Sequence, residues 1–289
     1  MKRHTSIAAW IFTFVLLSAA SNWAQVPTSG LVLRLEGDSG VEKALSVPAG
    51  NGDPVVRWLD QSSAANHVVT NAPVATDTPT YRTGIANGHA AVEFGIDRDT
   101  ERLQASTPLL TGTTDFSIFA VVRMISPYTG GARYITGNYG AANNGLEFYI
   151  NNSKLAFYDN GSYFEGPAPL AGDTWYLVEM QKSGNNYSLR LNDGSNGSTT
   201  FVGLSIPGSR NWTVGNGPDY NSEALWGNIA AVLVYNTALS AEDHQSVITY
   251  LGNTYAVPEP TAMALMTMAS LLVWRKIRNP KSEIRNKSE

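Results

Sequence analysis

Short segments in which apolar and polar residues alternate recur along the central part of the chain, and turn-forming residues separate them. This alternation is typical of strands with one buried face. The predicted strands cover residues 30–35, 54–60, 90–94, 116–124, 132–136, 146–150, 154–158, 175–181, 187–191 and 212–214. Many short strands without intervening helices predict an all-β antiparallel sandwich or jelly roll.

Residues 225–255 differ, because an apolar run there is followed by a helical pattern. The run 226–235 is too apolar to alternate, which is typical of a strand covered on both faces. Ser240 then offers a hydroxyl as helix N-cap, with Asp243 three residues later. Apolar residues recur at helical spacing over 247–255, so we expect a short C-terminal helix that packs on the sandwich.

The first residues of the chain have the pattern of a secretory signal peptide. Residues 1–24 combine the basic pair Lys2 and Arg3, an apolar run over 7–17, and small residues after it. The run is shorter than the ~20 residues that span a bilayer. We therefore predict export, with cleavage after Ala20 or after Ala24.

A second pattern follows the last predicted helix. The tripeptide 258–260 precedes an apolar segment, 261–274, and then a basic cluster. A helix of that length reaches only about 21 Å, against a hydrocarbon core of ~30 Å. The residues that define the pattern are Pro258, Glu259, Pro260, Arg275, Lys276 and Arg278.

This order resembles the PEP-CTERM sorting signal of Gram-negative bacteria. The resemblance implies transient association with the inner membrane, followed by recognition and removal of residues 257–278 by an exosortase. The alternative is a proline-rich linker before a weak membrane anchor. Residues 279–289 are polar and nearly repeat a short sequence, so we expect a disordered tail.

The segments between the two ends resemble laminin-G-like, concanavalin A-like jellyroll domains. The resemblance is carried by GLVLRL at 30–35, VRWLDQS at 56–62, DFSIFAVV at 115–122, and the Gly, Val-Tyr and Leu-Ser positions of the closing segment. It implies one domain over 25–256 with the jellyroll fold and a short C-terminal helix. Some domains of this family bind Ca²⁺.

Charge and cysteine content narrow the range of partners and chemistry. Residues 25–256 carry 12 Lys/Arg and 21 Asp/Glu, although the whole chain has a net charge of only −4. An acidic block of this kind argues against a nucleic-acid partner, because phosphate contacts need a basic face. The chain has no cysteine, which excludes thiol catalysis and thiolate metal sites.

Candidate chemistry is sparse in the sequence. The Glu-x-Asp-x-x-Glu spacing of concanavalin A-like glucanases does not occur. The nearest carboxylates, Asp97, Asp99 and Glu101, alternate and could share one face. We expect a solvated loop there. The alternatives are a calcium site, because Ca²⁺ prefers several oxygen ligands, and a pair of catalytic carboxylates.

Two loops, 128–144 and 212–226, combine aromatic residues with Asn and Gly, as sugar-binding loops do. Carbohydrate recognition uses an aromatic surface for the apolar sugar face and polar groups for the hydroxyls. The candidate ligand-binding residues are Tyr139, Tyr220, Asn138 and Asn216.

Other aromatic and histidine residues are expected to have structural roles. We expect Trp58, Trp175 and Trp226 in the core, because large aromatic side chains dominate core packing. The histidines lack metal-ligand spacing, and His244 is expected on the exposed side of the last helix.

The sequence thus predicts an exported, non-catalytic surface or extracellular-matrix protein that binds carbohydrate or acts in adhesion. Its expected location is the cell envelope, the outer surface or the medium of a Gram-negative bacterium. Its expected partners are the secretion machinery, an exosortase, and an exopolysaccharide or surface glycan. Two alternatives stay open, a polysaccharide-acting glycoside hydrolase and a purely structural envelope component.

Overall fold

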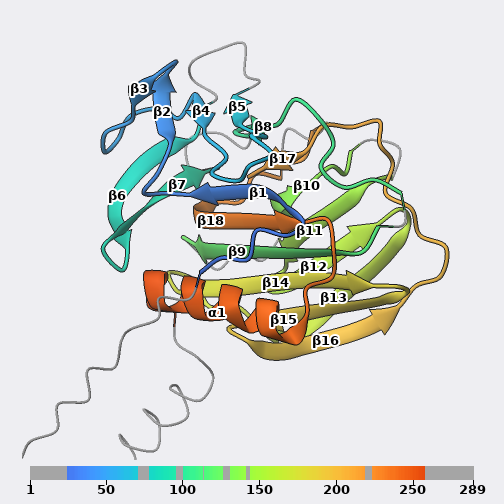
Figure 1. Ribbon diagram of the computed structural model, residues 1–289. Coiled ribbons are helices and arrows are strands. Elements are labelled where there is room, and N and C mark those ends of the chain that lie inside the picture. Colours follow the sequence, from blue (N-terminus) through green and yellow to red (C-terminus); the bar gives the residue numbers. More distant parts are fainter. Residues whose placement is uncertain are drawn as a thin grey trace, which may run out of the picture.

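The computed structural model describes residues 25–70, 78–95, 100–112, 114–125, 131–140, 144–218 and 223–257. In these residues, two antiparallel sheets pack face to face, and one helix lies on the outside of the first sheet (Figure 1). The fold predicted from the sequence, an all-β sandwich with a short C-terminal helix, is therefore confirmed.

The first sheet has eight strands. They are β1 (Leu31–Glu36), β6 (Thr80–Ala86), β7 (His89–Phe94), β9 (Phe116–Met124), β14 (Trp175–Ser183), β15 (Asn186–Leu191), β16 (Gly194–Thr200) and β18 (Gly227–Tyr235). Their order is β16-β15-β14-β9-β18-β7-β6, and β1 also pairs with β18. All nine residues of β18 are buried, as the continuous apolar run predicts.

The second sheet has ten strands, several of them very short. They are β2 (Val41–Ala44), β3 (Val47–Pro48), β4 (Arg57–Trp58), β5 (Val68–Thr70), β8 (Leu103–Gln104), β10 (Ala132–Gly137), β11 (Leu146–Asn151), β12 (Lys154–Asp159), β13 (Ser162–Pro169) and β17 (Thr213–Val214). Their order is β13-β12-β11-β10-β17-β8-β5-β4-β2-β3.

The main core lies between the two sheets and is built by alternation. In β11, for example, Leu146, Phe148 and Ile150 enter the core, whereas Glu147 and Tyr149 point to the other face. The Trp58 side chain is fully buried, and its indole N–H donates to the Glu36 carbonyl at 3.0 Å. Such strands of the second sheet therefore turn a second set of side chains away from the core, toward the outside of the sandwich.

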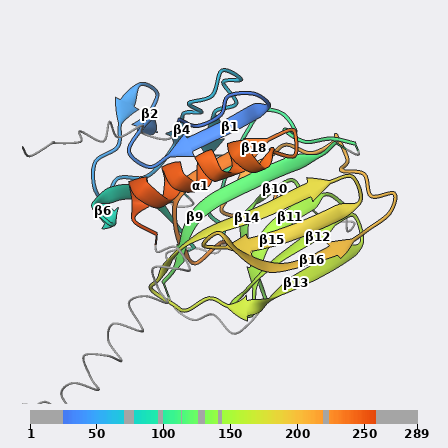
Figure 2. The ribbon, with the colours of Figure 1, turned by 60° about the horizontal axis from the view of Figure 1, so that its bottom comes forward.

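The helix α1 (Ala241–Tyr255) covers the outer face of the first sheet (Figure 2). Ser240 is its N-cap, because the Ser240 hydroxyl accepts from the Asp243 backbone N–H at 3.1 Å. Val247 and Leu251 are among the buried residues that pack on the apolar side chains of β9 and β18. The predicted cap and the predicted apolar stripe are both confirmed.

Two side-chain predictions for this region were wrong. His244 is buried, and its Nε2 lies 2.6 Å from the Glu179 carboxylate on β14. The last strand begins at Gly227, and Trp226 before it is 37% exposed. Trp226 has a φ of 52°, which turns its ring out of the core, where the Arg133 guanidinium stacks 5.0 Å from the ring centroid.

The sequence pattern also missed the strands β2, β3, β5, β6, β8, β13 and β16. Most of these strands are short or rich in polar residues and glycine, and such residues give no strand signal.

The predicted signal peptide and sorting signal, which includes Pro258, Glu259, Pro260, Arg275, Lys276 and Arg278, lie outside the described residues and stay predictions. In the part of the chain that the structure describes, the only helix is too short and too polar to cross a membrane.

Candidate functional site

A single row of paired residues crosses the outer face of the ten-stranded sheet. We call it the outer row. In order along the sheet it contains Arg57, Val69, Gln104, Thr213, Gly137, Glu147, Tyr158 and Tyr163. From β5 to β13 the row makes six steps of about 4.8 Å, or about 29 Å in total. Thr213 and Glu147 in the middle of the row are buried, and the exposed members of the row lie toward its two ends.

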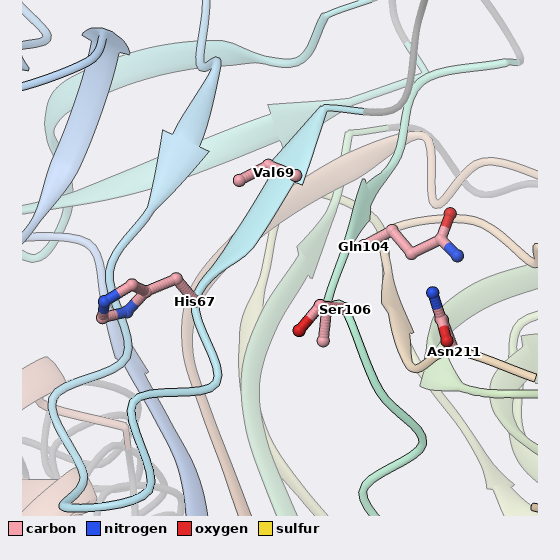
Figure 3. A pocket seen from close by; sticks show the side chains of 6 residues that line it. His67, Val69, Gln104, Ser106 and Asn211 are labelled. Carbon is pink, nitrogen blue, oxygen red and sulfur yellow. The ribbon is translucent and has the colours of Figure 1, made fainter.

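At one end of the outer row lies an open pocket of about 290 Å³. Its side chains come from three neighbouring segments, and alternation brings them to the same face, since Val68, Leu103 and Trp212 point into the core. The lining residues are His67, Val69, Gln104, Ala105, Ser106 and Asn211. Figure 3 shows the Gln104 and Asn211 amides turned toward each other, with His67 on the opposite side.

The loop that carries His67 is organised by one buried carboxylate. Asp60 accepts hydrogen bonds from the backbone N–H groups of Arg34, Ser62 and Asn66 at 2.7–2.8 Å, and from the Ser62 hydroxyl at 2.7 Å. The Asp60 backbone N–H donates in turn to His67 Nδ1 at 3.0 Å. These bonds fix residues 60–67 and hold the His67 ring at the edge of the pocket.

The pocket offers both apolar and hydrogen-bonding groups. Because His67 Nδ1 is an acceptor, the proton of the neutral ring is on Nε2, which can donate. Gln104 and Asn211 add amide groups, and Ser106 adds a hydroxyl. Val69 is 43% exposed and supplies an apolar contact. A few convergent polar groups beside an apolar surface are typical of small-ligand sites.

At the other end of the outer row, on β11 to β13, there is a patch of polar and aromatic side chains. Glu165 accepts from the Tyr163 hydroxyl at 2.5 Å, from Asn151 Nδ2 at 3.0 Å and from Lys154 Nζ at 3.1 Å. Tyr163 is 47% exposed, so its ring is available to a ligand. Tyr158 lies directly beside it in the register. We call these five residues the tyrosine patch.

The hydrogen bonds within the tyrosine patch determine the protonation states of Glu165 and Tyr163. Partial burial works against ionisation of Glu165, but the hydrogen bonds from Tyr163, Lys154 and Asn151 outweigh burial and lower the pKa of Glu165. Burial and the bond to Glu165 raise the pKa of Tyr163. At neutral pH the patch therefore presents a carboxylate and a protonated phenol.

Three of the predicted ligand-binding residues are described, and their side chains are buried. Tyr139 is 8% exposed, and its ring packs against Tyr158 with the centroids 4.7 Å apart. Asn138 is fully buried, accepts from Leu146 N–H and donates to the Pro207 carbonyl. Asn216 is also buried and accepts from Gly217 N–H. Both asparagines thus organise loops, and Tyr220 lies outside the described residues.

The predicted calcium ligands are only partly described. Asp97 and Asp99 lie outside the described residues. Glu101 is buried, and its carboxylate accepts from the Gly95 N–H at 2.6 Å, which ties the end of β7 to the following loop. Among the residues that the structure describes, no group of three or more His, Asp or Glu side chains could hold a metal ion.

Four candidate ligand contacts are not predicted from the sequence: His67, Gln104, Asn211 and Tyr163. Alternation is the signal that could have found some of them, because once the inward residues of a strand are known, their neighbours must point outward. That signal is weak for β5, β8 and β17, which have only two or three residues each.

Comparison with protein families identifies the domain. The model described as "Concanavalin A-like lectin/glucanases superfamily" matches residues 97–243, about half of the chain. The chain belongs to this superfamily. A search of curated proteins gives no match.

Several solved structures are similar at low identity. The CBM40 domain of the Ruminococcus gnavus IT-sialidase, bound to α2,3-sialyllactose, is 16% identical with a TM-score of 0.41, covering 48% of this chain and 84% of that chain. The SAP-like pentraxin of Limulus polyphemus is 18% identical with a TM-score of 0.40, covering 50% and 73%. Domain 4 of the arabinanase AbnA from Geobacillus stearothermophilus, in complex with arabinotriose, is 10% identical with a TM-score of 0.45, covering 78% and 100%. At these values the similarities assign no ligand to this chain.

Proposed function

We propose that this member of the concanavalin A-like superfamily is an exported, non-catalytic protein that binds a polysaccharide at the pocket and the tyrosine patch, the two ends of the outer row of its ten-stranded sheet. The observation that carries the proposal is the arrangement of the pocket at one end of the row and the tyrosine patch at the other. Membership of a superfamily described by lectins and glucanases supports a carbohydrate as the ligand.

The chemistry of the two ends suits sugar rings. A sugar presents an apolar C–H face and hydroxyls that both donate and accept. Val69 and Tyr163 are exposed enough to contact the apolar face. Gln104, Asn211 and the Nε2 of His67 can satisfy hydroxyls. The separation of about 29 Å along the row favours an extended chain over a single sugar.

A binding assay with purified protein tests this function. We expect retention on one or more polysaccharides of a glycan array or pull-down, weakened about tenfold by Tyr163→Ala or Gln104→Ala, since loss of one stacking or hydrogen-bonding group costs about 1–1.5 kcal/mol. Val202→Ala, at a residue that is 79% exposed and outside the outer row, is the control. If neither Tyr163→Ala nor Gln104→Ala weakens binding, the proposed location of the site is refuted. Release of reducing sugar would favour the hydrolase alternative.

We also propose that the protein is exported through its signal peptide and sorted through residues 257–278 to the cell envelope or the medium. The support is the order of tripeptide, apolar segment and basic cluster in the sequence. Expression in a host with an exosortase should give a mature protein whose mass lacks the residues after the tripeptide. Glu259→Ala should keep the full C-terminal mass. An uncut wild-type protein in that host would refute exosortase processing.

A further inference from the structure

A second pocket lies on the opposite face of the sandwich, where the first turn of α1 meets β14 and β15. Its volume is about 420 Å³. On β14, Val178 and Met180 enter the main core, so alternation turns Glu179 toward the helix. Arg190 on β15 pairs with Glu179 in the register and therefore lies on the same face. The pocket thus opens away from the outer row.

The walls of this second pocket carry one guanidinium and one accessible carboxylate. Arg190 Nε lies 3.8 Å from Glu179 Oε2, and a terminal nitrogen of Arg190 lies 3.9 Å from Asp193 Oδ1. Both distances are longer than a hydrogen bond, so the guanidinium can also donate to an oxygen atom of a ligand. Glu179 is 1% exposed, and His244 Nε2 contacts its Oε2 at 2.6 Å. Asp193 is therefore the carboxylate that a ligand can reach.

Backbone and side-chain hydrogen bonds hold the walls of the second pocket in place. The Asn192 amide oxygen accepts from the Leu177 N–H at 3.0 Å, and the Asn192 N–H donates to the Leu177 carbonyl at 2.8 Å. These bonds fix the turn that carries Asp193. On the other side, Gln181 Nε2 donates to the Leu239 carbonyl at 3.3 Å and holds the loop before α1. The site is thus formed before a ligand arrives.

The balance of charge in the second pocket favours a neutral ligand that has hydroxyl groups. An anion would be repelled by Asp193 and by the acidic first turn of α1, and a cation would lie against the Arg190 guanidinium. A hydroxyl can accept from Arg190 and donate to Asp193 at the same time. The half-buried Leu239 adds an apolar contact. A neutral sugar ring offers both hydroxyls and an apolar C–H face.

We propose that the second pocket binds one neutral sugar unit, and that the domain consequently bridges two polysaccharide chains, one on each face of the sandwich. The site itself does not depend on the outer row, whereas the bridging rests on the proposed function. Two sites that face opposite ways cannot easily hold the same short stretch of a chain. The protein would therefore cross-link a matrix rather than coat a single chain.

Retention of the purified protein on an immobilised neutral glucan and a neutral galactan, next to polygalacturonate, tests the site. Arg190→Gln and Asp193→Gly should each weaken retention on the neutral polysaccharide about 5–10-fold, because each removes a charge-assisted hydrogen bond. Glycine suits the φ of 63° at Asp193 and keeps the turn. Arg82→Gln is the matched control and should bind as wild type, since Arg82 also pairs with a carboxylate of the first sheet and its side chain is 36% exposed, against 39% for Arg190.

The double variant Tyr163→Ala/Gln104→Ala separates the two faces. Its remaining retention should fall further when Asp193→Gly is added, because the two sites act independently. Light scattering of the soluble neutral polysaccharide should rise on addition of wild-type protein and fall again in protein excess, as each chain becomes saturated. Arg190→Gln and the outer-row double variant should each abolish this rise, whereas Arg82→Gln should keep it.

Different results overturn different parts of the proposal. If the outer-row double variant loses all retention while Arg190→Gln and Asp193→Gly bind as wild type, the second site is wrong and the proposed function stands. If retention depends on Arg190 and Asp193 but not on the outer row, the bridge is wrong and the second site stands. Preferential retention on polygalacturonate, strengthened by Asp193→Gly, would contradict the neutral ligand. Retention on no polysaccharide would contradict both sites. If Arg190→Gln does not fold, Asp193→Gly decides alone.

Discussion

Replacement of Asp60 by alanine should unfold the edge of the pocket before it affects the sheets. The Asp60 carboxylate accepts four hydrogen bonds, three of them from backbone N–H groups, and the residue is 6% exposed. Bonds to a charged group are worth about 1.5–3 kcal/mol each. In the variant, water can accept part of the hydrogen bonds that Ser62 and Asn66 donate, because both residues are only half buried. We therefore expect Asp60→Ala to lose about 3–5 kcal/mol of unfolding free energy.

Urea unfolding followed by tryptophan fluorescence measures this loss. Asp60→Asn should fall between wild type and alanine, because an amide keeps one acceptor oxygen but faces the remaining donors with an NH₂ group. Glu242→Ala, at an exposed position in the first turn of α1, should change stability by no more than about 0.5 kcal/mol. A loss below 1 kcal/mol in Asp60→Ala would refute the idea that this carboxylate organises the loop. Weaker glycan retention by Asp60→Ala at temperatures where it remains folded would connect the loop to the pocket.

Three further predictions concern stability. Ser240→Ala should cost about 1 kcal/mol in urea unfolding, because it removes the N-cap of α1; an unchanged midpoint would contradict the capping role. Gly227→Ala should lower the free energy of unfolding by about 1–3 kcal/mol, because the added Cβ would lie 2.1 Å from the Arg123 carbonyl oxygen. Gly252→Ala is the matched control in α1. Its Cβ meets no atom within 4 Å, so this variant should stabilise the helix by up to about 1 kcal/mol. Burial raises the pKa of Asp159 despite its bond from the Tyr187 hydroxyl, so the folded protein holds this proton more tightly than the unfolded chain. Stability should consequently fall as pH rises from the usual aspartate pKa through the raised value, and Asp159→Asn should flatten that part of a urea-midpoint profile.

The sequence predicts a strand well where apolar residues alternate with polar ones or form a continuous run. The core strands β9, β11, β14 and β18 are recognisable because their apolar residues lie on the face that meets the other sheet or the helix. Trp226 shows the limit, since a single positive φ turns an aromatic side chain out of an otherwise buried segment. His244 shows a second limit of prediction from sequence. Its buried ring is paired with Glu179, which is 65 residues away in the sequence.

The candidate site was harder to predict, because its residues meet only through pairing between distant strands. His67, Gln104 and Asn211 are far apart in sequence, and only Gln104 lies in a strand, which has two residues. The loop Asn138–Tyr139 was found by composition, but composition does not distinguish an amide that holds a loop from one that faces a ligand. Only the register of the ten-stranded sheet sets Gln104 between Val69 and Thr213, and so brings the segments of His67 and Asn211 to either side of it.

The position of β18 has a consequence for how the chain would fold during the proposed export. This strand, near the C-terminal end of the domain, pairs with β9 along one edge and with β1 and β7 along the other. If the N-terminus is translocated first, the first sheet therefore cannot close until residue 235 has emerged. Contacts of such large sequence separation form slowly, because the loop-closure entropy is lost before the pairing is gained. On the proposed export route, the domain should remain unfolded while it is threaded through a narrow translocation channel and should reach its native state only on the far side.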